Sequence, residues 1–326
     1  MANSICLARL NVLFLLMMFC ASCGGASTDN GPDGPPIVEE MRELPVGTQG
    51  KMVTAHPAIT VDGVGYRLYE QINQSDDLNP LVIYIGGSEG GFSTNEADVP
   101  AALLRAGFSV ATIGYFDFSG GPPILSEINA TAVQKHIKHL AQSYENGDAC
   151  VGIVGVSKGA ELTLMLASRG KLADAYVANV PSSVVWQASN VTLKSRSSWL
   201  VDGRPVPFLR YPMISKAALD IFRGGDDFRA VHDAGLKRKR AAEKAVISIE
   251  RIREPVLLMS ARQDHVWPSY EMSIAMMERL DAIGNSHKFQ HTDYDLNHFL
   301  FDHSEVIQDA ISFLDSEFSK NASCSQ

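Results

Sequence analysis

Residues 155–159, Gly-Val-Ser-Lys-Gly, contain the side chain best suited to nucleophilic chemistry, the hydroxyl of Ser157. They fit the pattern G-x-S-x-G, in which a serine sits on a sharp turn between a strand and a helix and exposes its hydroxyl. The residues two before and two after the serine must be small, because larger side chains would clash within the turn. The pattern predicts that Ser157 attacks an acyl carbonyl.

The residues around this pattern have the composition that such a turn requires. Val151 to Val154 form an apolar run typical of a buried strand, and Ala160 to Ala167 are typical of a helix. Glycine and serine are common, so an ordinary glycine-rich turn without catalytic function is the alternative. The strand before the serine and the helix after it favour the nucleophile.

A serine nucleophile needs a general base, and the base needs an acid that orients it. In the α/β-hydrolase fold the three follow in the order serine, acid, histidine. Asp264 follows an apolar run over residues 255–260, and His298 follows the last strand pattern of the chain. Catalytic residues gather in loops at strand ends in α/β sheets. We therefore predict a triad of Ser157, Asp264 and His298.

Four other residues near these positions are alternatives that the pattern favours less. Asp295 is the alternative acid. His265 adjoins the predicted acid but follows the wrong strand for the base, His291 lies inside a strand pattern, and His303 begins the terminal helix pattern. A purely structural role for His298 also stays open.

The oxygen of a tetrahedral intermediate needs backbone N–H donors, which form an oxyanion hole. One donor is expected from Lys158, directly after the nucleophile, and the other from the loop that follows the apolar run 81–85. That loop, residues 86–91, reads Gly-Gly-Ser-Glu-Gly-Gly, and its glycines let the backbone approach a substrate closely. Gly87 and Ser88 are the predicted donors. A phosphate-binding loop is the alternative, but the Lys-Ser/Thr ending of that motif is absent.

Strand and helix patterns alternate from about residue 50 onward. Apolar runs of strand length cover residues 81–85, 108–113, 151–154, 176–180, 256–259 and 287–294. Helical patterns lie near residues 96–106, 126–143, 158–169, 269–283 and 303–318, and residues 51–61 and 66–72 alternate like edge strands. Such apolar runs suit strands buried on both faces of a parallel sheet. The alternation predicts an α/β-hydrolase fold with a mostly parallel central sheet and helices on both faces.

Residues 182–250 interrupt this alternation and contain no clear core strand. An insertion of this length between two sheet strands is typical of a cap over an active site, and a peripheral excursion is the alternative. Within it, residues 237–240 read Lys-Arg-Lys-Arg. We interpret this basic run as a solvated helix face, with a polyphosphate-binding patch as the alternative.

The first 25 residues are typical of an export signal. Arg9 precedes an apolar run over residues 12–19, and small residues and cysteines follow. The run is too short to span a bilayer comfortably. Ala21-Ser22-Cys23 is similar to the end of a bacterial lipoprotein signal, which would attach a lipid to Cys23 and tether the protein to a membrane. We expect an exported protein, either a membrane-anchored lipoprotein or a secreted or periplasmic one, and a retained membrane anchor is a third alternative.

Composition and charge narrow the function classes. The chain has 326 residues, of which 45% are hydrophobic and 20% charged, and its formal net charge is −9. This composition suits one sizeable core, and the acidic charge argues against a nucleic-acid partner.

We expect a flexible linker over residues 26–45, one catalytic domain over 46–320 and a tail over 321–326. The cysteines, at positions 6, 20, 23, 150 and 324, show no spacing of a metal site or disulfide framework. No metal and no cofactor are expected.

Several segments resemble those of the acyl-CoA thioesterase and bile-acid-CoA:amino acid N-acyltransferase family. Residues 155–162, Gly-Val-Ser-Lys-Gly-Ala-Glu-Leu, resemble its nucleophile motif, and residues 263–269, Gln-Asp-His-Val-Trp-Pro-Ser, resemble its acid loop. Residues 86–91 resemble its glycine-rich loop, and residues 247–252 its segment before a strand. The resemblance covers about residues 80–318 and implies the family's C-terminal α/β-hydrolase domain, with His298 at the base position.

The resemblance implies hydrolysis of acyl-CoA thioesters, with departures that bear on the substrate. Only about 45 residues lie between the Gly- and Pro-rich stretch at 26–36 and Leu81, too few for the N-terminal β-sandwich that family members often carry. The acyltransferase branch uses a cysteine nucleophile, whereas Ser157 favours hydrolysis. Export would also separate the protein from intracellular acyl-CoA. An extracytoplasmic carboxylesterase is therefore the first alternative, and a non-catalytic binding lipoprotein the second.

Overall fold

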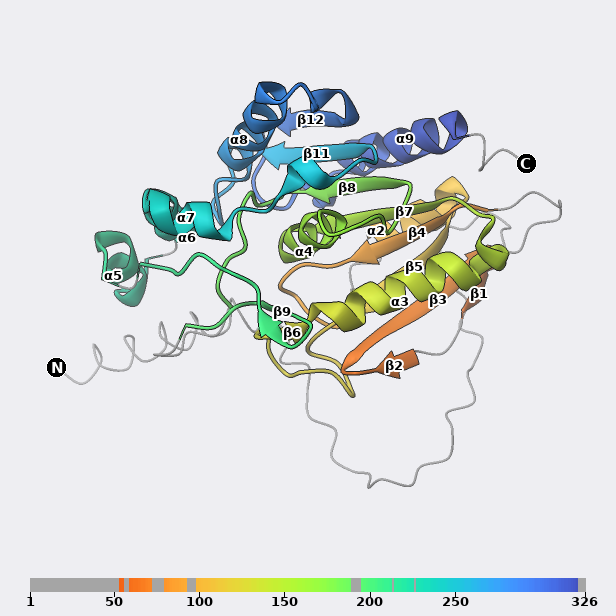
Figure 1. Ribbon diagram of the computed structural model, residues 1–326, viewed down its shortest axis with the longest axis horizontal. Coiled ribbons are helices and arrows are strands. Elements are labelled where there is room, and N and C mark those ends of the chain that lie inside the picture. The colour runs from red at the N-terminus through yellow and green to blue at the C-terminus, as the bar shows by residue number, and fades with distance from the viewer. Residues whose placement is uncertain are drawn as a thin grey trace.

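A computed structural model describes residues 53–321, apart from residues 56–58, 72–78, 93–97, 189–194, 213 and 226. Within these residues, nine strands form one sheet in the order β1-β3-β5-β4-β7-β8-β11-β12, with β2 paired to β3 (Figure 1). The five contacts from β5 to β12 are parallel, and those of β1, β2 and β5 with β3 are antiparallel. The predicted mostly parallel sheet is confirmed.

The strands of this sheet are β1 (Val53–Ala55), β2 (Ile59–Val61), β3 (Val64–Gln71), β4 (Leu81–Ile85), β5 (Ser109–Gly114), β7 (Val151–Val156), β8 (Ala175–Asn179), β11 (Val256–Ala261) and β12 (Phe289–Tyr294). The helices around it are α2 (Asp98–Ala106), α3 (Ala130–Ser143), α4 (Lys158–Ala167), α8 (Ser269–Ala282) and α9 (Ser304–Lys320), with short 3-10 turns η1 (Tyr144–Gly147), η3 (Ser286–Lys288) and η4 (Leu300–Asp302). Among the described residues each expected strand and helix is present, although the last strand begins two residues later and α3 four residues later than the sequence patterns suggested.

Two apolar cores lie on opposite faces of the sheet. One joins strand residues such as Ile83 and Ile153 to helices α3, α4 and α8, and the other joins Val82 and Val154 to helices α2 and α9. Successive side chains of a strand point to opposite faces, so each central strand contributes to both cores. This arrangement explains why β4 and β7 are apolar along their whole length and β8 up to its last residue, Asn179, and it confirms the prediction of helices on both faces.

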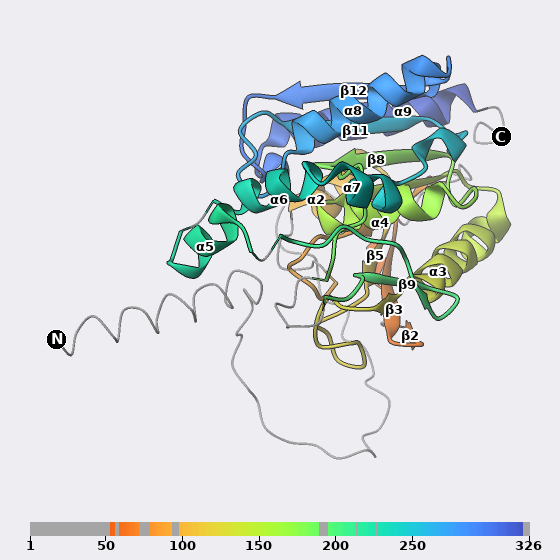
Figure 2. The same cartoon turned by 60° about the vertical axis from the view of Figure 1, so that its left-hand side comes forward.

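The excursion over residues 182–250 adds no strand to the main sheet. It contains β9 (Trp199–Val201), which pairs with both β10 (Arg204–Pro205) and β6 (Ile128–Asn129), then α5 (Lys216–Phe222), α6 (Phe228–Leu236), α7 (Lys239–Ala245) and η2 (Ile249–Arg251). Its own small core surrounds the buried Trp186 and includes Leu209 and Trp267. Figure 2 shows α6 and α7 against the body of the molecule and α5 projecting from it.

The predictions for the two ends of the chain, for a membrane span and for the cysteines compare with the structure as follows. The expected signal, the lipid-attachment residue Cys23, the linker and the last five residues of the tail lie outside the described residues. Among the described helices, none has the length and apolar character needed to cross a membrane. Cys150, directly before β7, is disulfide-bonded. The cysteine spacing did not predict this bond.

Candidate active site

Ser157 occupies a strained turn between β7 and α4. Its backbone has φ 52° and ψ −113°, a region that side-chain-bearing residues seldom adopt. The flanking glycines are required by close packing, because a Cβ on Gly155 would lie 2.4 Å from Thr163 Oγ1 and a Cβ on Gly159 would lie 2.2 Å from the Ile85 carbonyl oxygen. The turn is fixed further by a 2.9 Å hydrogen bond from the Ser157 N–H to the Asn179 carbonyl. The geometry is that of the predicted nucleophile turn.

The structure brings the three predicted triad residues together. His298 Nε2 lies 3.0 Å from Ser157 Oγ, and His298 Nδ1 lies 2.9 Å from each carboxylate oxygen of Asp264. The serine follows β7, the aspartate follows β11 and the histidine follows β12, so three separate strand ends supply them. Imidazole between a hydroxyl and a carboxylate can accept the hydroxyl proton while the carboxylate stabilises the resulting charge.

Asp264 is almost completely buried, with 1% of its surface exposed. Burial alone would raise the pKa of this carboxyl, but hydrogen bonds and the charge of His298 outweigh burial and lower it. Its other donors are the N–H groups of Val266 and Trp267 and the hydroxyl of Ser269, at 2.6–3.1 Å. A carboxylate with this many donors stays ionised and fixed in orientation.

The alternative residues do not join this arrangement. Asp295 accepts a 2.9 Å hydrogen bond from Gln263, and the ring of His291 contacts Ser260 Oγ at 2.7 Å. His303 is the N-cap residue of α9, and His265 packs its ring against Phe299. Trp267, in the acid loop, donates its indole N–H to the Val180 carbonyl at 3.1 Å.

The glycine-rich loop lies directly against Ser157. A Cβ on Gly87 would lie 3.2 Å from the Cβ of Ser157, so the backbone of this residue is as close to the serine as packing allows. In this structure the Gly87 N–H donates to Glu89 Oε1 at 2.7 Å. Glu89 therefore places a carboxylate where this predicted donor points. The Lys158 N–H is the first of helix α4, and the first N–H groups of a helix have no acceptor within it.

Behind the turn lies a buried polar cluster that the sequence patterns did not predict. Lys158 Nζ and Glu161 Oε1 are 2.6 Å apart, and both residues are buried. Glu161 also accepts hydrogen bonds from the indole of Trp199 at 2.7 Å and the N–H of Trp186 at 3.3 Å. Burial lowers the pKa of Lys158 and raises that of Glu161, and each charge partly offsets this effect on the other.

This cluster connects the excursion to the nucleophile turn, because Trp186 and Trp199 both belong to the excursion. A second contact reaches the acid loop: the Arg229 N–H, in α6, donates to the His265 carbonyl, and the Arg229 guanidinium donates to the Asp264 carbonyl, both at 3.1 Å. The spacing of i and i+3 between Lys158 and Glu161 could have indicated a helix pair, but their burial and their tryptophan partners depend on the fold.

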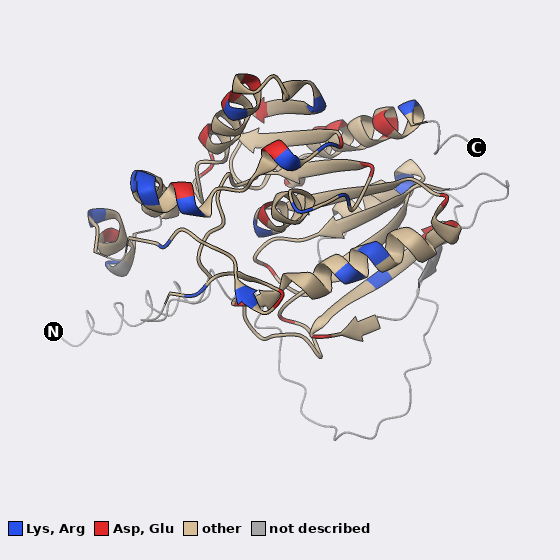
Figure 3. Ribbon diagram, viewed as in Figure 1, with Lys and Arg blue, Asp and Glu red and all other residues tan. Residues whose placement is uncertain are grey.

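The basic run of the excursion is solvent-exposed. Lys237 and Arg238 follow α6, and Lys239 and Arg240 begin α7. Figure 3 shows Lys and Arg at this corner of the molecule. Exposure agrees with the predicted solvated helix face, and it leaves the charges accessible to a ligand.

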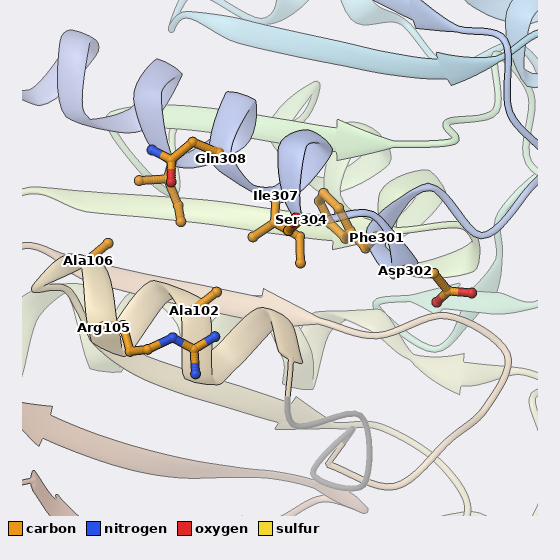
Figure 4. Close-up of a pocket in the computed structure, with 9 residues that line it drawn as sticks. Ala102, Arg105, Ala106, Phe301, Asp302, Ser304, Ile307 and Gln308 are labelled. Carbon is orange, nitrogen blue, oxygen red and sulfur yellow. The ribbon is translucent and has the colours of Figure 1, made fainter. Parts of the chain in front are cut away.

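A separate hollow of about 450 Å³ lies between α2 on one side and η4 with the first half of α9 on the other (Figure 4). Its lining residues are Ala102, Arg105, Ala106, Phe301, Asp302, Ser304, Ile307, Gln308 and Ile311. None of the three triad residues lines it. Among the described residues, no group of three or more His, Cys, Asp or Glu side chains is arranged to hold a metal ion.

A family model described as BAAT / Acyl-CoA thioester hydrolase C terminal matches residues 133–300, just over half of the chain. Acyl-coenzyme A thioesterase 5 of Mus musculus is 23% identical over 206 residues, which are 63% of this chain and 45% of that protein. Acyl-coenzyme A thioesterase 1 of Mus musculus is 25% identical over 206 residues, with the same coverage of 63% and 45%. The chain thus spans less than half the length of these curated relatives.

Solved structures show the same fold. A Pyrococcus furiosus esterase superposes with a TM-score of 0.52 at 18% identity, over 87% of this chain and 99% of that one. A thermostable esterase from Pseudomonas putida superposes with a TM-score of 0.50 at 15% identity, over 82% of each chain. Together with the strand order and helix placement, these matches confirm the α/β-hydrolase fold.

Proposed function

Because the chain belongs to the family of BAAT / acyl-CoA thioester hydrolase C-terminal domains, we propose that it is a serine hydrolase that cleaves acyl thioesters. The observation that carries this proposal is the continuous contact from Ser157 Oγ through His298 to Asp264, at 3.0 and 2.9 Å. The names of its relatives, acyl-coenzyme A thioesterases, support an acyl-CoA as the substrate.

The proposed reaction has two steps. His298 takes the hydroxyl proton of Ser157 as the serine oxygen attacks the acyl carbonyl, and the same proton then passes to the departing thiol. Water attacks the resulting acyl-enzyme, gives its proton to His298 and releases the carboxylic acid with regeneration of the serine hydroxyl. The negative oxygen of each intermediate accepts from the Lys158 N–H and from the 86–88 backbone.

The experiment that tests this proposal compares hydrolysis of palmitoyl-CoA and of p-nitrophenyl acyl esters by the purified protein. We expect faster turnover of the thioester, and loss of both activities in Ser157→Ala. A suitable control is Ser168→Ala, since Ser168 is also a buried serine, at the other end of α4, with its hydroxyl bonded to the Met165 carbonyl. No Ser157-dependent turnover of either substrate would contradict the proposal and favour a binding protein.

A carboxylesterase is the second candidate, because Cys150 is disulfide-bonded. Disulfides persist mainly outside the cytoplasm, where acyl-CoA is scarce, so this bond supports an exported enzyme with an ester substrate. Turnover of esters alone in the same assay would establish this candidate in place of the thioesterase.

Charge reversal of the basic run separates the two candidates further. Coenzyme A carries phosphates, and the exposed residues 237–240 form the basic cluster of the excursion. We expect Lys237→Glu/Arg238→Glu/Lys239→Glu/Arg240→Glu to raise KM for palmitoyl-CoA about tenfold and KM for a neutral ester less than twofold, because only the phosphates feel the reversed charge. Equal changes in both KM values would contradict a role for this run in binding CoA.

A further inference from the structure

Tyr115 lies directly beneath the glycine-rich loop and contacts two of its carbonyl groups. Its hydroxyl is 2.8 Å from the Gly86 carbonyl oxygen and 2.6 Å from the Gly87 carbonyl oxygen. The residue follows the last residue of β5 and is 2% exposed. Both carbonyls therefore turn toward one buried hydroxyl, which can only donate to them.

The orientation of a carbonyl also fixes the N–H of the same peptide. A trans peptide is planar, and its C=O and N–H point in opposite directions. With the Gly86 carbonyl held on Tyr115, the Gly87 N–H must point away from the ring. The Gly87 carbonyl likewise turns the Ser88 N–H away from it. The first of these N–H groups donates to Glu89 Oε1, on the side of the loop where Ser157 lies.

We propose that Tyr115 is a positioning residue that holds the N–H groups of Gly87 and Ser88 toward the oxyanion position. This inference rests on the proposed serine hydrolase mechanism and deepens it. Tyr115 does not touch the reacting atoms and acts through the peptides of the loop.

The surroundings of the hydroxyl keep it a donor. Burial raises the pKa of Tyr115 well above its ordinary value, and the nearby acids Glu89 and Glu161 raise it further, so the proton stays on the phenol. The ring is held in place by Trp199, with ring centroids 5.7 Å apart, and by Phe116 at 5.2 Å. Because Trp199 also binds Glu161, the loop and the nucleophile turn share one buried support.

The test is Tyr115→Phe, which removes the hydroxyl and keeps the ring. The matched control is Tyr144→Phe, since Tyr144 is also buried and its hydroxyl donates to Ser109 Oγ at 2.8 Å, at the opposite end of β5. With a p-nitrophenyl ester, we expect kcat of Tyr115→Phe to fall about 10- to 100-fold and KM to change less than about threefold. The Ki of a trifluoromethyl ketone, which mimics the tetrahedral intermediate, should rise by the same factor as kcat falls. Tyr144→Phe should change neither value more than about twofold.

A kcat of Tyr115→Phe within twofold of the parent, or an equal loss in Tyr144→Phe, would overturn the inference while the proposed function stands. If the parent protein shows no Ser157-dependent turnover, the proposed function fails instead. A crystal structure of Tyr115→Phe then still tests the positioning role. We expect the Gly86–Gly87 and Gly87–Ser88 peptides to rotate, and unchanged peptide orientations would overturn the inference.

Discussion

Asp264→Asn should lower kcat about 10⁴-fold and leave KM within about threefold of its original value. An asparagine fits the same space, but its amide N–H₂ can meet His298 Nδ1 only when that nitrogen lacks a proton. The imidazole then carries its proton on Nε2, 3.0 Å from Ser157 Oγ, where an unprotonated acceptor is needed. The measurement is steady-state hydrolysis of palmitoyl-CoA and of a p-nitrophenyl ester.

Asp295→Asn is the matched control for this substitution, because Asp295 is the alternative acid of the same region. Its side chain binds Gln263 at 2.9 Å and not the histidine, so we expect kcat within about twofold of the parent. A comparable loss in both variants, or full activity of Asp264→Asn, would show that the observed contact with His298 does not serve catalysis.

Glu161→Ala should destabilise the protein by about 3–5 kcal/mol, a fall in Tm of about 10 °C for a domain of this size. The substitution leaves the buried Lys158 ammonium without its partner, 2.6 Å away in the parent. It also removes the acceptor of the Trp199 indole and of the Trp186 N–H, and an unsatisfied buried donor adds its own cost. Thermal and urea denaturation measure the change.

Glu317→Ala is the control, since Glu317 and Lys320 are also three residues apart on a helix with a 2.6 Å contact, but the lysine side chain is 62% exposed. An exposed pair of this kind contributes about 1 kcal/mol or less. The double variant Lys158→Met/Glu161→Leu should recover part of the stability lost in Glu161→Ala, because it leaves no unpaired buried charge. Equal melting temperatures of Glu161→Ala and Glu317→Ala would contradict this account.

The residues that local spacing governs were predictable from the sequence. The nucleophile turn depends on Gly155 and Gly159, whose positions relative to Ser157 are fixed by the chain itself. The order of acid and histidine follows from the order of strands, so Asp264 and His298 could be assigned to strand ends before any distance was known. Continuous apolar runs identified the parallel strands in the same way. A strand that is buried on both faces is apolar at successive positions, so it can be recognised from its own residues without knowledge of its neighbours.

The supporting contacts were not predictable, because they join residues that are distant in the chain. Glu161 meets Trp199 across 38 residues, and Tyr115 meets Gly86 across 29. Nothing in either segment indicates the other, and a tyrosine or glutamate in an apolar run is as compatible with a surface position. The disulfide of Cys150 was also missed, because the pairing of cysteines cannot be deduced from their spacing in the sequence alone.

Glu89 occupies the Gly87 N–H in the resting protein, so within the proposed mechanism an oxygen of the substrate reaches this donor only by ligand exchange. A neutral acyl carbonyl is a weaker acceptor than a carboxylate, and it gains little by displacing Glu89. The tetrahedral intermediate carries a full negative charge and competes with that carboxylate on equal terms. The cost of displacing Glu89 is the same for both oxygens, so the preference of this donor for the transition state comes from the greater negative charge of that state. Within the proposed mechanism, Glu89 thus keeps the Gly87 N–H satisfied until negative charge develops on the substrate oxygen.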